Sequence, residues 1–171
     1  FFIDVQEKLA PAIHEISSMK KPLLTLIKTA QVFKMPIYLT EQYPRGLGKT
    51  LDEYSDLLRD KSVKYWEKTC FSALLPEILD QIKEDGVDTI IVCGVESHIC
   101  VFQTVRDLLK EGFTVHLAAD AVGSRSLDNK NTALALMREM GAIISNSETI
   151  AYDLLKDSKS ENFKVISDTL K

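Results

Sequence analysis

Short apolar runs rich in β-branched residues alternate with longer amphipathic segments along the whole chain. The apolar runs predict strands, and the segments between them carry the spacing of helices. Strands that alternate with helices form a parallel sheet covered on both faces. The sequence therefore predicts a three-layer, Rossmann-like α/β/α sandwich around a parallel sheet of about six strands. The expected strands are 1–4, 35–40, 62–66, 88–93, 113–118 and 142–145, and the expected helices are 22–33, 51–58, 73–83, 97–110, 128–140, 150–155 and 163–170.

Length and composition fit a globular protein with one domain spanning 1–171. The chain has 171 residues, of which 45% are hydrophobic and 27% are charged, and this is enough to build a substantial core. The formal net charge of −4 argues against a nucleic-acid-binding surface. No apolar run reaches the roughly 20 residues that a membrane span needs. We therefore expect neither a nucleic acid nor a membrane as a partner.

Three cysteines, Cys70, Cys93 and Cys100, are too few for a disulfide framework, and none of them forms a CxxC pair. This pattern indicates a reducing compartment, so a cytoplasmic location is expected. Because the chain opens on Phe1 inside an expected strand, we also expect upstream residues. An organellar targeting segment among those residues stays open as an alternative.

Cys100 lies at a joint between a strand and a helix. The apolar run ends at Gly94, and a helical pattern begins near Ser97. Such joints lie at the carboxyl edge of a parallel sheet, where open α/β folds bind their ligands. A thiol in the first turn of a helix is close to the positive end of the helix dipole, which lowers its pKa. Cys100 is therefore expected to be reactive, and to alkylate faster than Cys70 or Cys93.

Asp4 and Lys68 occupy comparable places at the ends of two other expected strands. Because the carboxyl ends of parallel strands share one edge, both side chains can converge on Cys100. A thiol nucleophile needs a base for its proton, which Asp4 can supply, and a cation that favours the thiolate, which Lys68 can supply. Taken singly, each residue has an ordinary explanation: a helix cap, a solvated lysine and a core cysteine. Their joint placement favours a catalytic site.

The motifs around these residues resemble the isochorismatase-like cysteine hydrolases, which include nicotinamidases, N-carbamoylsarcosine amidases and isochorismatases. The resemblance covers essentially the whole chain. It rests on the D-x-Q motif of Asp4 and Gln6, on Lys68 followed by Phe71-Ser-Ala73, and on Gly94-Val-Glu-Ser-His-Ile-Cys-Val101. The last segment is the most specific of the three.

The resemblance implies roles for five residues. Asp4, Lys68 and Cys100 match the family's catalytic triad. The family has a cis peptide bond at the position of Val95 and Glu96, and it directs the N–H groups of Glu96 and Cys100 at an oxyanion. By resemblance alone, a homo-oligomer is also expected.

The nicotinamidase branch of the family binds a metal ion through D-x-H after the second strand and a further histidine before the triad lysine. Here the second strand continues into Thr40-Glu-Gln-Tyr43, and no histidine lies between His14 and His98. We therefore expect no metal, no other cofactor and no pyridine-amide substrate. The stretch from Thr40 to Gly48 is similar instead to the small isochorismatase-domain proteins.

Residues next to the triad in sequence, or at the end of a neighbouring strand, are expected to line a small substrate pocket. The apolar candidates are Trp66, Phe71 and Ile99, and the polar candidates are Gln6, Glu41 and Gln42. The alternative for Trp66 and Phe71 is a place in the core, because large aromatic side chains are usually mostly buried.

The resulting hypothesis is a metal-independent cysteine hydrolase that acts on a small amide or related C–N bond through an acyl-enzyme. One alternative is a catalytically weak or inactive binding or scaffold protein of the same fold. The other is a hydrolase of a vinyl ether such as isochorismate. Intact Asp4, Lys68 and Cys100 favour the first function, and true isochorismatases commonly lack the nucleophilic cysteine.

Overall fold

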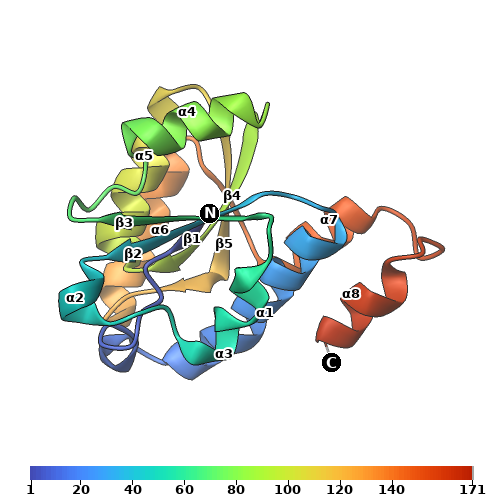
Figure 1. Cartoon of the computed structure of the whole chain (residues 1–171), viewed down its shortest axis with the longest axis horizontal. Helices are drawn as coiled ribbons and strands as arrows, with labels where there is room; N and C mark the ends of the chain where they lie inside the picture. The colour runs from blue at the N-terminus through green and yellow to red at the C-terminus, as the bar shows by residue number, and fades with distance from the viewer. Residues whose placement is uncertain (171) are drawn as a thin grey trace.

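The computed structural model describes residues 1–170, in which six parallel strands form one sheet in the order β3-β2-β1-β4-β5-β6. Helices cover both faces of this sheet (Figure 1). The predicted three-layer α/β/α fold is confirmed. The strands are β1 (Phe2–Ile3), β2 (Ile37–Gln42), β3 (Val63–Lys68), β4 (Thr89–Val95), β5 (Thr114–Gly123) and β6 (Ile143–Ser145).

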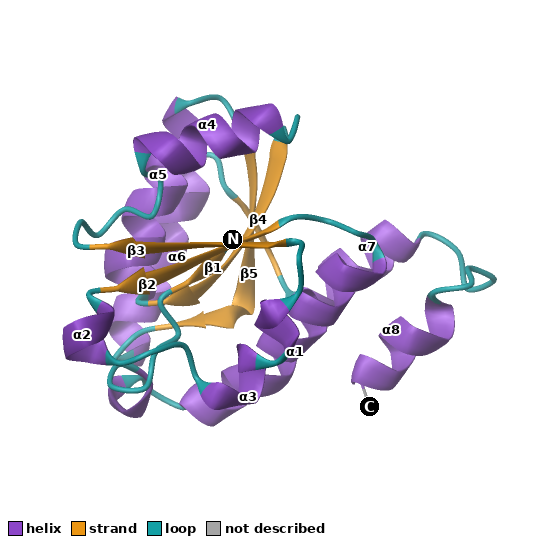
Figure 2. Cartoon of the chain, viewed as in Figure 1, coloured by secondary structure: helices purple, strands orange, loops and turns teal. Residues whose placement is uncertain are grey.

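The helices form the two outer layers. They are α1 (Ile16–Val32), α2 (Pro44–Leu47), α3 (Asp52–Ser55), α4 (Pro76–Glu84), α5 (Phe102–Lys110), α6 (Leu127–Glu139), α7 (Ser147–Leu155) and α8 (Phe163–Leu170). Helices α4, α5 and α6 cover one face of the sheet, while α1 and α7 cover the other, with α8 packed outside them (Figure 2). Within residues 1–170, no helix has the length and apolar character needed to cross a membrane.

Each face of the sheet buries its own apolar cluster. On the α4–α6 side, Ile78 and Val105 are fully buried and belong to the same cluster as Val92 of the sheet. On the α1 side, Met19 and Leu23 pack in a cluster with Val95. Burying a side chain of this size stabilises the fold by about 1.5–3 kcal/mol. The two clusters therefore hold β4, and the turn that follows it, from both sides.

Helix α1 begins at Ile16 instead of near Pro22, where the sequence predicted its start. A proline inside a helix removes one hydrogen bond to the carbonyl four residues earlier, here that of Ser18. Ser18 is exposed, so water can satisfy its carbonyl. Met19 and Leu23, on the buried side, hold the helix to the sheet on either side of Pro22.

Four strands extend further than the sequence predicted: β2 continues to Gln42 and β4 to Val95, and β3 and β5 are also longer. β3 continues to Lys68, which pairs with Gln42 at the end of β2. β5 continues past Ala118 to Gly123, and its register against β4 shifts between Val92 and Gly94. These extensions bring Lys68 and the residues after Gly123 to the carboxyl edge of the sheet.

Gly94 allows β4 to approach β1 closely. Its φ is +120°, and a Cβ at this position would overlap the backbone carbonyl oxygen of Ile3. Only glycine fits such a contact without moving the backbone. The close approach sets the turn after β4 beside Asp4, which follows β1 directly.

Candidate active site

Asp4 and Lys68 form a buried ion pair at the carboxyl edge of the sheet. Lys68 Nζ lies 2.6 Å from Asp4 Oδ2, and both side chains have 0% exposure. Thr40 Oγ1 donates a 2.9 Å hydrogen bond to the other carboxylate oxygen, Oδ1. Asp4 itself has a φ of +53°, a conformation that aspartate tolerates better than most residues. Both of its carboxylate oxygens are therefore engaged.

Cys100 lies in a single π-helical turn, Ser97–Val101, between β4 and α5. Only 6% of its surface is exposed. Thr104 fixes the turn, because its hydroxyl donates to the Cys100 carbonyl (2.6 Å) and accepts from the N–H of Ala73 (2.8 Å). The charges of both Asp4 and Lys68 act on the thiol and shift its pKa. The structure thus brings together the three residues, here called the Asp–Lys–Cys cluster.

The prediction that a helix terminus lowers the pKa of Cys100 is wrong. Burial raises the pKa of this thiol to about 12, with a further upward contribution from the Asp4 charge and an opposing one from Lys68. The loss of hydration outweighs the dipole of one helical turn, because desolvation penalises the charged form. At neutral pH the thiol is therefore protonated.

Asp4 is also shifted upward. Burial raises the pKa of its carboxyl above the ordinary value, although the Lys68 charge and the hydrogen bonds from Lys68 and Thr40 oppose the shift. A carboxylate with a raised pKa is a stronger base than free aspartate. The cluster thus pairs a protonated thiol with a base that can accept its proton.

For a bulky reagent, these burial differences reverse the expectation from the sequence that Cys100 is modified before Cys70. Cys70 is exposed, whereas Cys93 and Cys100 are buried. We expect a bulky aromatic disulfide reagent to modify Cys70 at least about tenfold faster than the other two, because reactivity follows access and thiolate fraction. Peptide mass spectrometry of the partly modified native protein measures this order. Fast native modification of Cys100 by the bulky reagent would contradict the burial described here.

Two of the expected polar pocket residues use their hydrogen bonds within the protein. Gln6 is fully buried, and its amide bonds to the backbone of Gln42 and Gly48. Glu41 Oε1 accepts from the N–H and hydroxyl of Thr50, and Oε2 accepts from the Tyr65 hydroxyl. These contacts favour structural positions for Gln6 and Glu41 over places on a pocket wall.

The three apolar residues expected to line the substrate pocket do not form one wall. Trp66 packs toward Tyr38, with ring centroids 6.4 Å apart, and this favours the core alternative for Trp66. The side chain of Phe71 is largely exposed, while its carbonyl accepts a 3.1 Å hydrogen bond from Lys68. Ile99 is half-buried against the core.

An open cleft of about 430 Å³ lies beside Lys68. Most of its wall comes from the end of β3 and from the segments that follow β2 and β3. The residues that line it are Tyr43, Pro44, Arg45, Glu67, Lys68, Thr69, Cys70 and Leu75. Because these residues lie at or just after the ends of two neighbouring strands, the sequence could have indicated that they line the cleft.

The segment at the start of the π-helical turn is anchored by Arg125. The peptide bond between Val95 and Glu96 is cis. The buried carboxylate of Glu96 accepts from the backbone N–H of Arg125 (3.0 Å), from Nε (3.1 Å) and from Nη2 (2.6 Å). Although burial opposes the shift, these bonds hold the pKa of Glu96 below its ordinary value. Nothing in the sequence pointed to Arg125, because it is distant along the chain.

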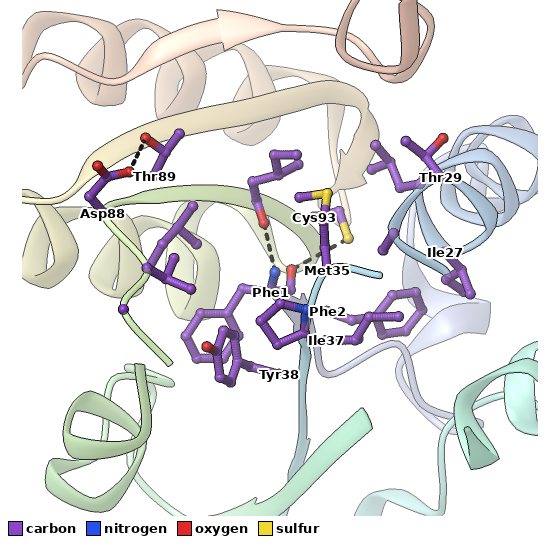
Figure 3. Close-up of a pocket in the computed structure, with 17 residues that line it drawn as sticks. Phe1, Phe2, Ile27, Thr29, Met35, Ile37, Tyr38, Asp88, Thr89 and Cys93 are labelled. Atoms are coloured by element: carbon purple, nitrogen blue, oxygen red, sulfur yellow. Dashed lines mark hydrogen bonds between the residues drawn. The ribbon is translucent and has the colours of Figure 1, made fainter. Parts of the chain in front are cut away.

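A second cavity, of about 290 Å³, lies at the opposite, amino edge of the sheet (Figure 3). Apolar side chains such as Phe2 and Ile37 make up most of its wall. Cys93 also lines it and donates a hydrogen bond to the Phe1 carbonyl. Burial raises the pKa of Cys93 to about 11. The cavity contains no member of the Asp–Lys–Cys cluster.

The fold and this site together define an α/β protein with a buried cysteine, carboxylate and lysine at the carboxyl edge of its sheet. The model of the isochorismatase domain matches residues 1–149. The chain therefore belongs to the isochorismatase family of hydrolases.

Individual relatives agree with this assignment. Isochorismatase family protein 1A of Dictyostelium discoideum is 37% identical over 97% of this chain and 82% of its own length. A structure described as the MAR1 ribonuclease of Caenorhabditis elegans is 35% identical, with a TM-score of 0.94 over 99% of this chain and 87% of that one. The YcaC protein of Escherichia coli, described as an octameric hydrolase of unknown specificity, is 23% identical, with a TM-score of 0.86 over 99% and 93%. The last likeness shows the fold alone.

Proposed function

We propose that the protein is a cysteine hydrolase that cleaves a small amide or related C–N bond through Cys100, Asp4 and Lys68. The observation that carries this proposal is the buried cluster itself. Lys68 and Asp4 are paired at 2.6 Å, and the thiol interacts with both. Buried charges are costly unless they are paired. A nucleophile, a base and a cation gathered at a strand edge are the set that acyl transfer needs.

In the proposed reaction, Asp4 takes the thiol proton as the sulfur attacks the carbonyl carbon. The N–H groups of Glu96 and Cys100 are the donors that we assign to the developing oxyanion. The C–N bond then breaks, and the leaving amine takes the proton from Asp4. Water attacks the resulting thioester, releases the carboxylic acid and returns a proton to the sulfur. Throughout, Lys68 balances the charge that moves between Cys100 and Asp4.

The names of relatives suggest two further expectations. By likeness to the octameric YcaC protein, we expect this chain to form a homo-oligomer. The ribonuclease name of the nematode relative makes RNA cleavage an activity to test. The net charge of −4 favours a small molecule over RNA, because RNA binding usually depends on a basic surface.

The proposal is tested by a panel of small amides, ureides, enol ethers and a short RNA, each incubated with wild type and with Cys100→Ala. Turnover of an amide or ureide by the wild type, with a covalent acyl adduct on Cys100 in rapid-quench mass spectra, would support it. Turnover of only the enol ether or only the RNA would replace it. If nothing is hydrolysed and no adduct forms, the binding or scaffold alternative takes its place.

Activity is expected to survive exhaustive chelation. Within residues 1–170, no group of three or more His, Cys, Asp or Glu side chains is placed to hold a metal ion, and the candidate nucleophile is a thiol with its own base. We expect turnover to change by less than about twofold after dialysis against a chelator. Loss of activity that one equivalent of Zn²⁺ restores would contradict this and favour a metal-dependent amidase.

A further inference from the structure

Four oxygen atoms surround the ammonium of Lys68. Its Nζ lies 2.6 Å from Asp4 Oδ2, 2.7 Å from Gln42 Oε1, 3.1 Å from the Phe71 carbonyl and 3.3 Å from the Cys70 carbonyl. An ammonium has only three N–H donors. Its protons are therefore fully used by the protein, and Lys68 serves as a charge held in a fixed place.

Among the groups that contact the Lys68 ammonium, Gln42 contributes the neutral side chain. The orientation of its amide is fixed by its neighbours. Oε1 accepts from Lys68, while Nε2 donates a 2.7 Å hydrogen bond to the carbonyl of Thr69. A flipped amide would set a donor against the ammonium and an acceptor against a carbonyl, so the network excludes it. Gln42 thus holds Lys68 both through the ammonium and through the backbone of the next residue.

Gln6 connects Gln42 back to Asp4. Gln42 N–H donates to Gln6 Oε1 (2.7 Å), and Gln6 Nε2 donates to the carbonyls of Gln42 (3.0 Å) and Gly48 (2.6 Å). Gln6 lies two residues after Asp4, so the contacts close a ring through Asp4, Gln6, Gln42 and Lys68. This ring ties together the ends of β1, β2 and β3.

We propose that Gln42 is a positioning residue, which holds the Lys68 ammonium against Asp4 and Cys100 instead of contacting the substrate. The inference rests on the proposed function. Lys68 lowers the pKa values of both Asp4 and Cys100, so a loosely held ammonium should lower them less. Removing the Gln42 amide should therefore move the reactivity of Cys100 to higher pH.

The test compares wild type with Gln42→Met, which keeps the length of the side chain and removes its polar atoms. Acrylamide, a small amide electrophile, is added across a range of pH, and the adduct on Cys100 is measured by peptide mass spectrometry. We expect the profile to move to higher pH, so that the rate of adduct formation at a given pH below the midpoint falls about tenfold. Gln31→Met is the matched control, because the Gln31 amide also donates to a backbone carbonyl, that of Leu57, but Gln31 lies on α1, away from the Asp–Lys–Cys cluster.

A substrate-independent measurement separates this inference from the proposed function. Denaturant midpoints are compared for Gln42→Met, Lys68→Met and the double variant. We expect Gln42→Met to lower the midpoint less when Lys68 is already absent, because the stability effects of substitutions at two contacting residues do not add. The inference would be overturned if the midpoint shifts of the two single variants added up to that of the double variant. It would also be overturned if Gln42→Met had the same pH profile as Gln31→Met. If Cys100 of the wild type reacts no faster than Cys93 at any pH, the proposed function fails, and the midpoints still decide the role of Gln42.

Discussion

Cys100→Ala is expected to lower hydrolysis of an amide substrate by about 10⁴-fold or more, because loss of the nucleophile removes the covalent route. The fold should persist. Cys100 belongs to the apolar cluster on the α4–α6 side, and trimming one buried sulfur costs about 1 kcal/mol of stability. The measurements are kcat/KM on the best substrate of the panel and the free energy of unfolding in denaturant.

Cys93→Ala provides the matched control. Cys93 is also a buried cysteine of low exposure, but it packs in the apolar cluster on the α1 side of the sheet, on the wall of the second cavity. We expect a similar loss of stability with kcat/KM within about twofold of wild type. Retention of full activity in folded Cys100→Ala would rule out covalent catalysis by this residue.

The positions of the strands along the chain and their parallel arrangement were predictable, because each strand is a short apolar run and helices alternate with the strands. Gly94, where the sequence predicted the end of a strand, is an exception, because β4 continues through it to Val95; the glycine is needed there because no side chain fits beside β1. The start of α1 was not predictable from Pro22, since the burial of Met19 outweighs the preference of proline for a first turn. The extension of β5 depends on its register with β4, a long-range property that no local pattern carries.

The members of the Asp–Lys–Cys cluster were predictable because parallel strands end at a common edge. β1 lies between β2 and β4, so Asp4 stands where the strand order reverses, the usual place for a ligand. The pKa of Cys100 was not predictable, since it depends on how completely the folded chain excludes water. Arg125 was missed for a related reason, because its contact with Glu96 joins residues that only the fold brings together.

Breaking the buried ion pair is expected to be the most damaging change to stability at this site. Lys68→Met leaves Asp4 buried without its cation, and removal of one partner of such a pair typically costs about 3–5 kcal/mol. The penalty should depend on pH. The pKa of Asp4 is already raised by burial, and Lys68 opposes this shift, so the variant raises it further. When a carboxyl group has a higher pKa in the folded protein than in the unfolded chain, the protein loses stability as pH rises from the unfolded-state pKa through the folded-state pKa.

The loss of stability in Lys68→Met should therefore be greatest near pH 8 and smaller near pH 4, where a neutral Asp4 needs no partner. Urea unfolding at both pH values measures it. The double variant Asp4→Asn with Lys68→Met removes both charges and should recover much of the lost stability, since a neutral pair of similar volume avoids the desolvation penalty. It should recover no activity, because it lacks the base. A double variant as unstable as Lys68→Met would show that the pair contributes through packing, and a pH-independent loss would show that Asp4 is not the group left unpaired.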